Sequence, residues 1–128
     1  PDVCKWQQAD VFDYLRRARE AGDTYDLIIL DPPKFASSHY HVDRAARAYK
    51  DINLNGLRLL RAGGQLLTFS CSGAIDTDLF QKIVAGAVID SRRQAWALSR
   101  FGAGVDHPLL MTFPEGEYLK GLHLKLCD

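Results

Sequence analysis

At 128 residues, with 47% hydrophobic and 25% charged residues, the chain has the size and composition of one globular domain that buries a core. Lys plus Arg and Asp plus Glu number 16 each, and this formal net charge of zero excludes a whole-chain electrostatic attraction to nucleic acid or to a membrane surface. No apolar run is long enough to predict a membrane-spanning helix.

The cysteines Cys4, Cys71 and Cys127 are widely spaced and form no CxxC pair. This pattern predicts free thiols in a reducing, cytoplasmic compartment and no zinc site. His39 and His41 lie close together in the sequence, but no acidic or thiol partner completes a metal site. We therefore interpret both histidines as loop residues.

The first predicted elements are a short strand at Val3–Gln7 and a helix that Asp10 caps. Gly22 ends this helix, and its apolar residues share one face. They are Val11, Phe12, Leu15 and Ala18. The apolar run Tyr25–Leu30 follows and is too short for a helix of its own, so it predicts a strand buried on both faces.

Asp31 ends that strand, and Pro32 and Pro33 then forbid either a helix or a further ladder of hydrogen bonds. Residues Phe35–Tyr40 form a polar loop of the length expected for a binding lid.

A long helix is predicted from Asp43 to Arg61, with a stop at Gly63-Gly64. Its buried face recurs at helical spacing and consists of Ala45, Tyr49, Ile52, Gly56 and Leu59. A second buried strand, Gln65–Cys71, follows. The next helix starts at Asp76 and packs an apolar face inward, namely Leu79, Phe80, Ile83, Val84 and Ala87.

A strand is predicted at Arg93–Phe101, a turn-rich loop at Gly102–Pro108 and a short extended segment at Leu109–Phe113. In the last strand, Tyr118–Cys127, every second residue is apolar: Leu122, Leu124 and Leu126. Strands and helices therefore alternate and end in a hairpin-like pair of strands. This order predicts a three-layer α/β sheet.

The two buried strands end on residues that carry chemistry, Asp31 and Cys71. In open α/β sheets ligands bind in the crevice at the carboxyl ends of parallel strands. On these residues alone, simpler interpretations stay open. Asp-Pro is an ordinary way to leave a strand, and cysteine is among the most buried residue types.

Several motifs in one order resemble the S-adenosylmethionine-dependent ribosomal RNA 5-methylcytosine methyltransferases of the large-subunit methyltransferase I type. These motifs are Asp31–Phe35, Tyr49–Asn53, Leu67–Gly73, Asp106–Pro108 and Pro114–Gly121. The resemblance runs nearly from end to end. It implies the Rossmann-like methyltransferase fold, in which the two motif-bearing strands are central neighbours.

The family holds the methionine and ribose of its cofactor with a glycine-rich turn and an acidic residue, and neither occurs before Asp10. The chain also opens on Pro1 rather than on Met. We therefore expect residues 1–128 to be the C-terminal portion of the catalytic domain, a truncated sheet lacking the N-terminal cofactor-binding strands. We expect it to bind S-adenosylmethionine weakly.

The resemblance makes Cys71 the nucleophile that adds to carbon-6 of cytosine, while Cys4 and Cys127 are interpreted as structural. Asp31 would face the pyrimidine edge, where it accepts a hydrogen bond or shares a proton, and it also borders the cofactor.

The resemblance implies that Asp10 contacts the adenine amine of the cofactor. Pro32 is expected to border the cofactor, with its carbonyl accepting a hydrogen bond from the exocyclic amine of the cytosine. Pro33 would hold the loop rigid beside the substrate. Lys34 is expected to bind a phosphate or to lower the thiol pKa, with a solvated lysine as the alternative. Phe35 is a candidate for stacking on a flipped base, with a packing role as the alternative.

Lys50, Asp51 and Asn53, early in the long helix, are expected either to support the loop or to contact RNA. The implied partner is ribosomal RNA, reached through the full-length protein. Without the family's first strand, Tyr25–Asp31 is expected to be unpaired on one side, which predicts a homodimer. Two other functions stay open: a nucleic-acid N-methyltransferase that uses the Asp-Pro-Pro loop without a cysteine, and an inactive dimerising fragment.

Overall fold

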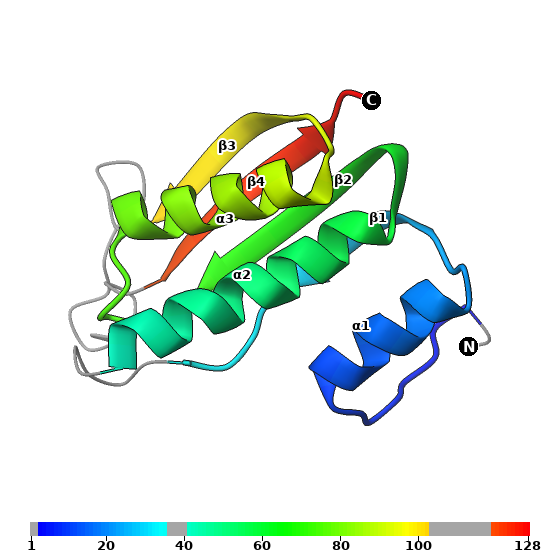
Figure 1. Ribbon diagram of the computed structural model, residues 1–128, viewed down its shortest axis with the longest axis horizontal. Coiled ribbons are helices and arrows are strands. Elements are labelled where there is room, and N and C mark those ends of the chain that lie inside the picture. Colours follow the sequence, from blue (N-terminus) through cyan, green and yellow to red (C-terminus); the bar gives the residue numbers. More distant parts are fainter. Residues whose placement is uncertain (1–2, 36–40, 103–118) are drawn as a thin grey trace.

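The computed structural model describes residues 3–35, 41–102 and 119–128. Within these ranges the chain forms three helices and four strands (Figure 1). They are α1 (Val11–Glu20), β1 (Tyr25–Leu30), α2 (Val42–Arg58), β2 (Leu60–Ser70), α3 (Thr77–Ser91), β3 (Ala95–Gly102) and β4 (Lys120–Leu126). The predicted loops after Gly102 and most of the predicted lid, Phe35–Tyr40, lie outside the described residues.

The strands form one sheet in the order β1-β2-β4-β3. β1 and β2 are parallel, and β4 is antiparallel to both of its neighbours, β2 and β3. Two predictions are therefore confirmed. The strands that precede Asp31 and Cys71 are neighbours, and the last two strands form an antiparallel, hairpin-like pair. Insertion of β4 between β2 and β3 brings the end of the described chain into the interior of the sheet.

Helices α2 and α3 lie side by side across one face of the sheet (Figure 1). The predicted inward face of α2 is confirmed, since Tyr49 and Ile52 are almost fully buried, and Phe80 and Val84 are the corresponding residues of α3. Alternate residues of β2 and β4 complete this core, among them Leu66, Leu122, Leu124 and Leu126. The apolar side chains that alternate along the strands and those that recur at helical spacing in α2 and α3 thus pack together in one core.

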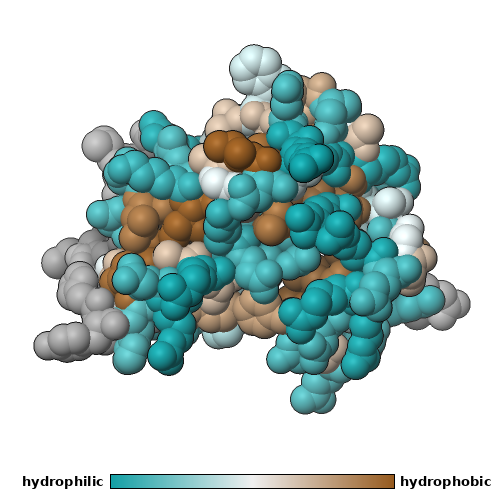
Figure 2. Space-filling view, viewed as in Figure 1, coloured by the Kyte–Doolittle hydropathy of each residue, from teal (hydrophilic) through white to brown (hydrophobic). Residues whose placement is uncertain are grey.

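The outer surface of the helices differs between them. Figure 2 shows mostly hydrophilic residues over α1 and α2, whereas apolar residues gather over α3. Ile89 of α3 is an exposed apolar residue of this kind. None of the helices within the described ranges is long and apolar enough to cross a membrane.

The opposite face of the sheet is open in the part of the chain that the structure describes. The prediction that Tyr25–Leu30 is buried on both faces is wrong, because Leu27 is 50% and Ile29 58% exposed. Leu30, on the helix side of the same strand, is buried. Burial of alternate residues depends on what packs on each face, and the described sheet and helices together supply two of the three predicted layers.

The predicted strand at Val3–Gln7 is also wrong. These residues have no strand structure, and Val3 and Trp6 are more than 90% exposed. A strand requires a hydrogen-bonded neighbour, and the four-stranded sheet includes none of these residues. This segment therefore has no strand to pair with among the described residues.

The long helix ends earlier than predicted. Its last residue is Arg58, and β2 begins at Leu60, so Gly63 and Gly64 lie within β2 rather than after the helix. Gly63 has a φ of +75°, and the register between β1 and β2 shifts next to this pair. Gly63 therefore fits an irregularity in the strand, because its positive φ favours glycine, and Gly64 follows it there.

Candidate active site at the carboxyl ends of β1 and β2

The parallel pairing of β1 and β2 places the two predicted functional segments at one edge of the sheet. Leu30, the last residue of β1, is paired with Thr68 of β2. Asp31 and Cys71 follow the carboxyl ends of these strands, so both lie at the edge where open α/β sheets bind ligands. Lys120, the first residue of the antiparallel strand β4, pairs with Ser70 and reaches the same edge.

The loop after β1 presents polar groups on a partly buried backbone. Asp31, Pro33 and Lys34 are exposed, while Pro32 is buried beneath them. The Asp31 carboxylate therefore lies at the surface of the edge, where it is accessible to a ligand.

Phe35 belongs to a cluster of aromatic rings. Its ring meets Tyr49 edge-on with centroids 4.7 Å apart, and the centroid of the Phe12 ring lies 6.0 Å from that of Phe35. Tyr49 in turn contacts Phe80 edge-on. These contacts favour a packing role for Phe35 over a free stacking surface.

The residues around Cys71 are tied to α2 by hydrogen bonds. The Tyr49 hydroxyl lies 2.7 Å from Ser72 Oγ, and the Ser72 amide donates to Ser70 Oγ at 3.3 Å. Ser70 and Ser72 are buried, whereas Cys71 between them is half-buried and not in a disulfide. The turn therefore holds its two serines inside and leaves the thiol partly accessible.

Lys120 is the residue of this site that the sequence reasoning missed. It is 5% exposed, and its Nζ donates a 2.8 Å hydrogen bond to the carbonyl of Ser72. Burial lowers the pKa of Lys120, and the negative charges of Cys71 and Asp76 act in the opposite direction. A signal was present in the alternation of the last strand, because Lys120 has the same parity as the inward-facing leucines.

The three polar residues of α2 whose roles were left open have contacts of their own. Lys50 forms an ion pair with Asp90 of α3 at 2.7 Å, and Asp51 accepts a hydrogen bond from Asn55. Asn53 is fully buried and donates to the Tyr49 carbonyl. Among the two alternatives, these contacts favour support of the helix layer over contact with RNA.

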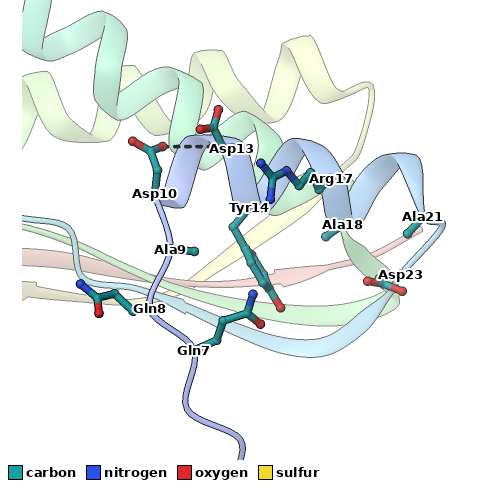
Figure 3. A pocket seen from close by; sticks show the side chains of 10 residues that line it. All are labelled: Gln7, Gln8, Ala9, Asp10, Asp13, Tyr14, Arg17, Ala18, Ala21 and Asp23. Carbon is teal, nitrogen blue, oxygen red and sulfur yellow. Dashed lines mark hydrogen bonds between the residues drawn. The ribbon is translucent and has the colours of Figure 1, made fainter.

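Asp10 caps α1 as predicted, and its Oδ1 accepts from the amides of Phe12 and Asp13. It also borders a cavity of about 480 Å³ between α1 and the segment that precedes it (Figure 3). Tyr14 extends from α1 toward Gln7 at the other side of this cavity. The cap uses Oδ1 in both of these bonds, so Oδ2 takes no part in the cap and can accept from a ligand amine.

No group of three or more His, Cys, Asp or Glu side chains is placed to hold a metal ion in the described part of the chain. His39 and the Asp106–Pro108 motif are outside that part, so their predicted roles stay predictions.

Comparison with known proteins gives relatives over almost the whole chain, although no family model matches it. The chain is 51% identical over 121 residues to "Ribosomal RNA large subunit methyltransferase I" of Shewanella frigidimarina, covering 94% of this chain and 30% of that protein. The proteins of the same name from Shewanella amazonensis and Erwinia tasmaniensis are 52% and 50% identical, and 94% of this chain is covered in each case. The chain therefore spans less than a third of the length of these relatives.

Two solved structures share the fold. A SAM-dependent methyltransferase from Streptococcus mutans superposes with a TM-score of 0.70 at 24% identity, covering 91% of this chain and 29% of the other. A methyltransferase complexed with SAH superposes with a TM-score of 0.69 at 25% identity, covering 91% and 30%. The Rossmann-like α/β fold and the predicted resemblance to large-subunit methyltransferase I are thus confirmed.

Proposed function

We propose that this chain, which matches ribosomal RNA large subunit methyltransferase I proteins over nearly its whole length, forms the C-terminal portion of the catalytic domain of such an enzyme. The proposed reaction is S-adenosylmethionine-dependent methylation of cytosine carbon-5 in ribosomal RNA. Its support is the identity of about half of the aligned residues, together with a fold shared with SAM-dependent methyltransferases. The free cysteines fit a reducing, cytoplasmic location.

The observation that carries the proposal is the common edge of β1 and β2. Asp31 and Cys71 follow the ends of two paired parallel strands, and Cys71 lies in a turn that hydrogen bonds fix from both sides. A carboxylate and a partly accessible thiol at the ligand-binding edge of an α/β sheet suit covalent chemistry on a pyrimidine ring.

Carbon-5 of cytosine is a poor nucleophile, and addition of the Cys71 thiolate to the ring makes it a better one. The thiolate adds to carbon-6, and the electron pair of the ring double bond moves toward carbon-5, which becomes enamine-like and can accept a methyl group. A base then removes the carbon-5 proton, the double bond re-forms and the sulfur leaves. In its bound form S-adenosylmethionine supplies an electrophilic methyl group to this edge.

Asp31 is exposed at the same edge of the sheet as this thiol and is proposed to bind the amine or ring nitrogen-3 of the cytosine, which stabilises charge that develops as sulfur adds. Pro32 is buried and sets the course of the loop, while Pro33 and Lys34 are exposed and are proposed to face the substrate backbone. Phe35 is proposed to hold the loop against α2 through its edge-on contact with Tyr49.

The residues present fit one end of the cofactor. Asp10 lines a cavity large enough for an aromatic base, and the carboxylate oxygen that the cap does not use suits the adenine amine. The described chain offers no glycine-rich turn for the methionine end. We propose that residues of the longer protein supply it.

The open sheet face supports the same view of the chain as a portion of a domain. Leu27 and Ile29 are exposed apolar residues of β1, and the outer edge of β1 has no partner strand among the described residues. In the full-length protein, further strands and helices are proposed to cover both. In the isolated chain, a second copy is proposed to do so, which keeps the inactive dimerising fragment as an alternative.

An N-methyltransferase is the second candidate function, because an Asp-Pro-Pro loop followed by an aromatic residue suits methylation of nitrogen. The products distinguish the two. A full-length protein that carries this segment is incubated with unmodified ribosomal RNA and radiolabelled S-adenosylmethionine, and the nucleosides are separated. Labelled 5-methylcytidine supports the proposal, whereas label on a nitrogen overturns it.

A further inference from the structure

A lysine with a buried head group lies directly beneath the turn that carries Cys71. Lys120 is 5% exposed, and its Nζ reaches the carbonyl of Ser72 at 2.8 Å. An ammonium group is costly to bury, and an apolar side chain of similar length would avoid that cost. An apolar residue at position 120 would match the strand, because Leu122, the next inward-facing residue of β4, is itself apolar and buried. Because an apolar residue would avoid the cost of burying a charge, we expect Lys120 to have a function at this edge of the sheet.

Among the described residues, two groups act on the charge of this ammonium. Asp76, the N-cap of α3, and Cys71 are the groups whose negative charge favours the protonated form of Lys120 and raises its pKa against the lowering by burial. On the other neighbouring strand, Lys120 pairs with Gly102 of β3, which brings no charge. Asp31 and Lys34 border the same edge from the loop after β1 and are exposed to solvent.

We propose that Lys120 is a positioning residue for Cys71: its ammonium fixes the turn through the Ser72 carbonyl and holds a positive charge that stabilises the Cys71 thiolate. The inference rests on the proposed function for its purpose, since the thiolate and not the thiol attacks carbon-6. The same charge also distinguishes the three cysteines. Cys4 and Cys127 are exposed, and neither has a buried lysine beside it in the described structure.

The inference is tested by thiol alkylation, which requires neither cofactor nor RNA. In a background in which Cys4 and Cys127 are replaced by Ser, the rate constant for iodoacetamide is measured at pH 7 and at pH 10. An ordinary thiol is ionised at pH 10. The rate constant at pH 7 divided by that at pH 10 therefore reports how far the thiolate is stabilised at pH 7. Lys120→Met is compared with Lys120→Arg, and Lys125→Met on the exposed side of the same strand is the matched control.

In Lys120→Met we expect this ratio to fall by about threefold to tenfold, because a lost positive charge reduces the thiolate fraction at pH 7, whereas nearly all of the thiol is ionised at pH 10 with or without the lysine. Lys120→Arg should restore most of the ratio, and Lys125→Met should leave it unchanged. Simple loosening of the turn would raise both rates and leave the ratio as it was. A ratio in Lys120→Met equal to that of the parent overturns the inference.

If Lys120→Met does not fold, alkylation of the unaltered chain tests the inference instead. Mass spectrometry of partly alkylated protein gives the ratio for each cysteine separately. We expect Cys71, although half-buried, to have a higher ratio than exposed Cys4 and Cys127. An equal or lower ratio at Cys71 overturns the inference. A failure of the proposed function would instead appear in the RNA product assay, with thiol reactivity unaffected.

Discussion

The hydroxyl of Tyr49 lies 2.7 Å from the Oγ of Ser72, both groups are buried, and the two residues belong to different layers of the fold. This contact fastens the middle of α2 to the turn that follows β2. The same tyrosine ring packs edge-on against Phe35 of the loop after β1. One side chain thus connects the Asp-Pro-Pro loop to the Cys71 turn, so the relative position of the two candidate segments depends on the helix between them.

Removal of the Tyr49 hydroxyl is expected to destabilise the fold without removing the ring. Tyr49→Phe leaves Ser72 Oγ buried with one partner fewer, which costs about 1–2 kcal/mol of unfolding free energy. Urea denaturation followed by circular dichroism measures this loss. The control is Tyr14→Phe. The hydrogen bond of the Tyr14 hydroxyl to that of Tyr25 is exposed and long, at 3.5 Å, so its removal should change stability little. Equal effects of the two variants would contradict the expectation.

Cys71→Ala in a full-length protein that carries this segment should abolish 5-methylcytosine formation while cofactor affinity stays unchanged, since alanine removes the nucleophile and little volume. The loss should exceed a thousandfold, about 4 kcal/mol of barrier. Cys127→Ala, at an exposed position beyond β4, is the matched control and should retain activity. A Cys71→Ala protein that methylates at the parental rate would rule out the covalent mechanism and favour nitrogen methylation.

The 128-residue chain by itself is expected to bind S-adenosylmethionine weakly or undetectably, since Asp10 and the loop after β1 offer contacts to only part of the cofactor. Isothermal titration calorimetry at high protein concentration tests this expectation. Micromolar affinity, about −8 kcal/mol, would show that the residues present form a sufficient site. Asp10→Ser, which keeps a capping oxygen, should then weaken any binding that is observed if the carboxylate contacts the adenine amine.

The isolated chain is expected to self-associate through β1. This strand pairs only with β2 in the described sheet, and its Leu27 and Ile29 side chains are exposed. Light scattering at micromolar concentration should give the mass of a dimer. Ile29→Lys, which places a charge on the open face of an edge strand, should shift the chain to monomer. Ile89→Lys on the exposed side of α3 is the control, and a monomeric parent chain would refute the expectation.

Asp128 makes stability depend on pH through Arg93. The guanidinium donates two hydrogen bonds to this carboxylate, and these hold the pKa of Asp128 below its usual value. A lowered pKa means that the stabilisation is present above the unfolded-state value of about 4 and is lost as the pH falls through the folded-state value. Asp128→Asn should therefore cost about 1 kcal/mol at pH 7, and this cost should shrink as the pH falls below about 4. Thermal melts at pH 7 and below about pH 4 measure this.

The matched control for that comparison is Asp78→Asn. Asp78 pairs with Lys82 one helical turn away, and both side chains are more than 70% exposed. The pair should contribute little at either pH, because solvent screens it. A pH-dependent loss of the same size in both variants would mean that the effect comes from general charge and not from the Arg93 contact.

The sequence alone determined those features that follow from local periodicity and from short motifs. Asp10 was identified as a cap, the buried face of α2 was identified through Tyr49 and its helical neighbours, and Asp31 and Cys71 were placed at strand ends. Each of these depends on residues a few positions apart. Their geometry is set by the helix repeat or the strand repeat, which the chain has wherever it folds.

Only the tertiary structure decided which of these features meet and which faces are covered. Lys120 and Ser72 lie 48 positions apart and are joined because β4 inserts antiparallel to β2 with Lys120 opposite Ser70. The exposure of Leu27 depends likewise on what packs over β1, and an apolar strand has the same sequence whether one face or two are buried. Strand order and register are properties of distant segments, and the free energy that selects them comes from packing between layers rather than from any local pattern.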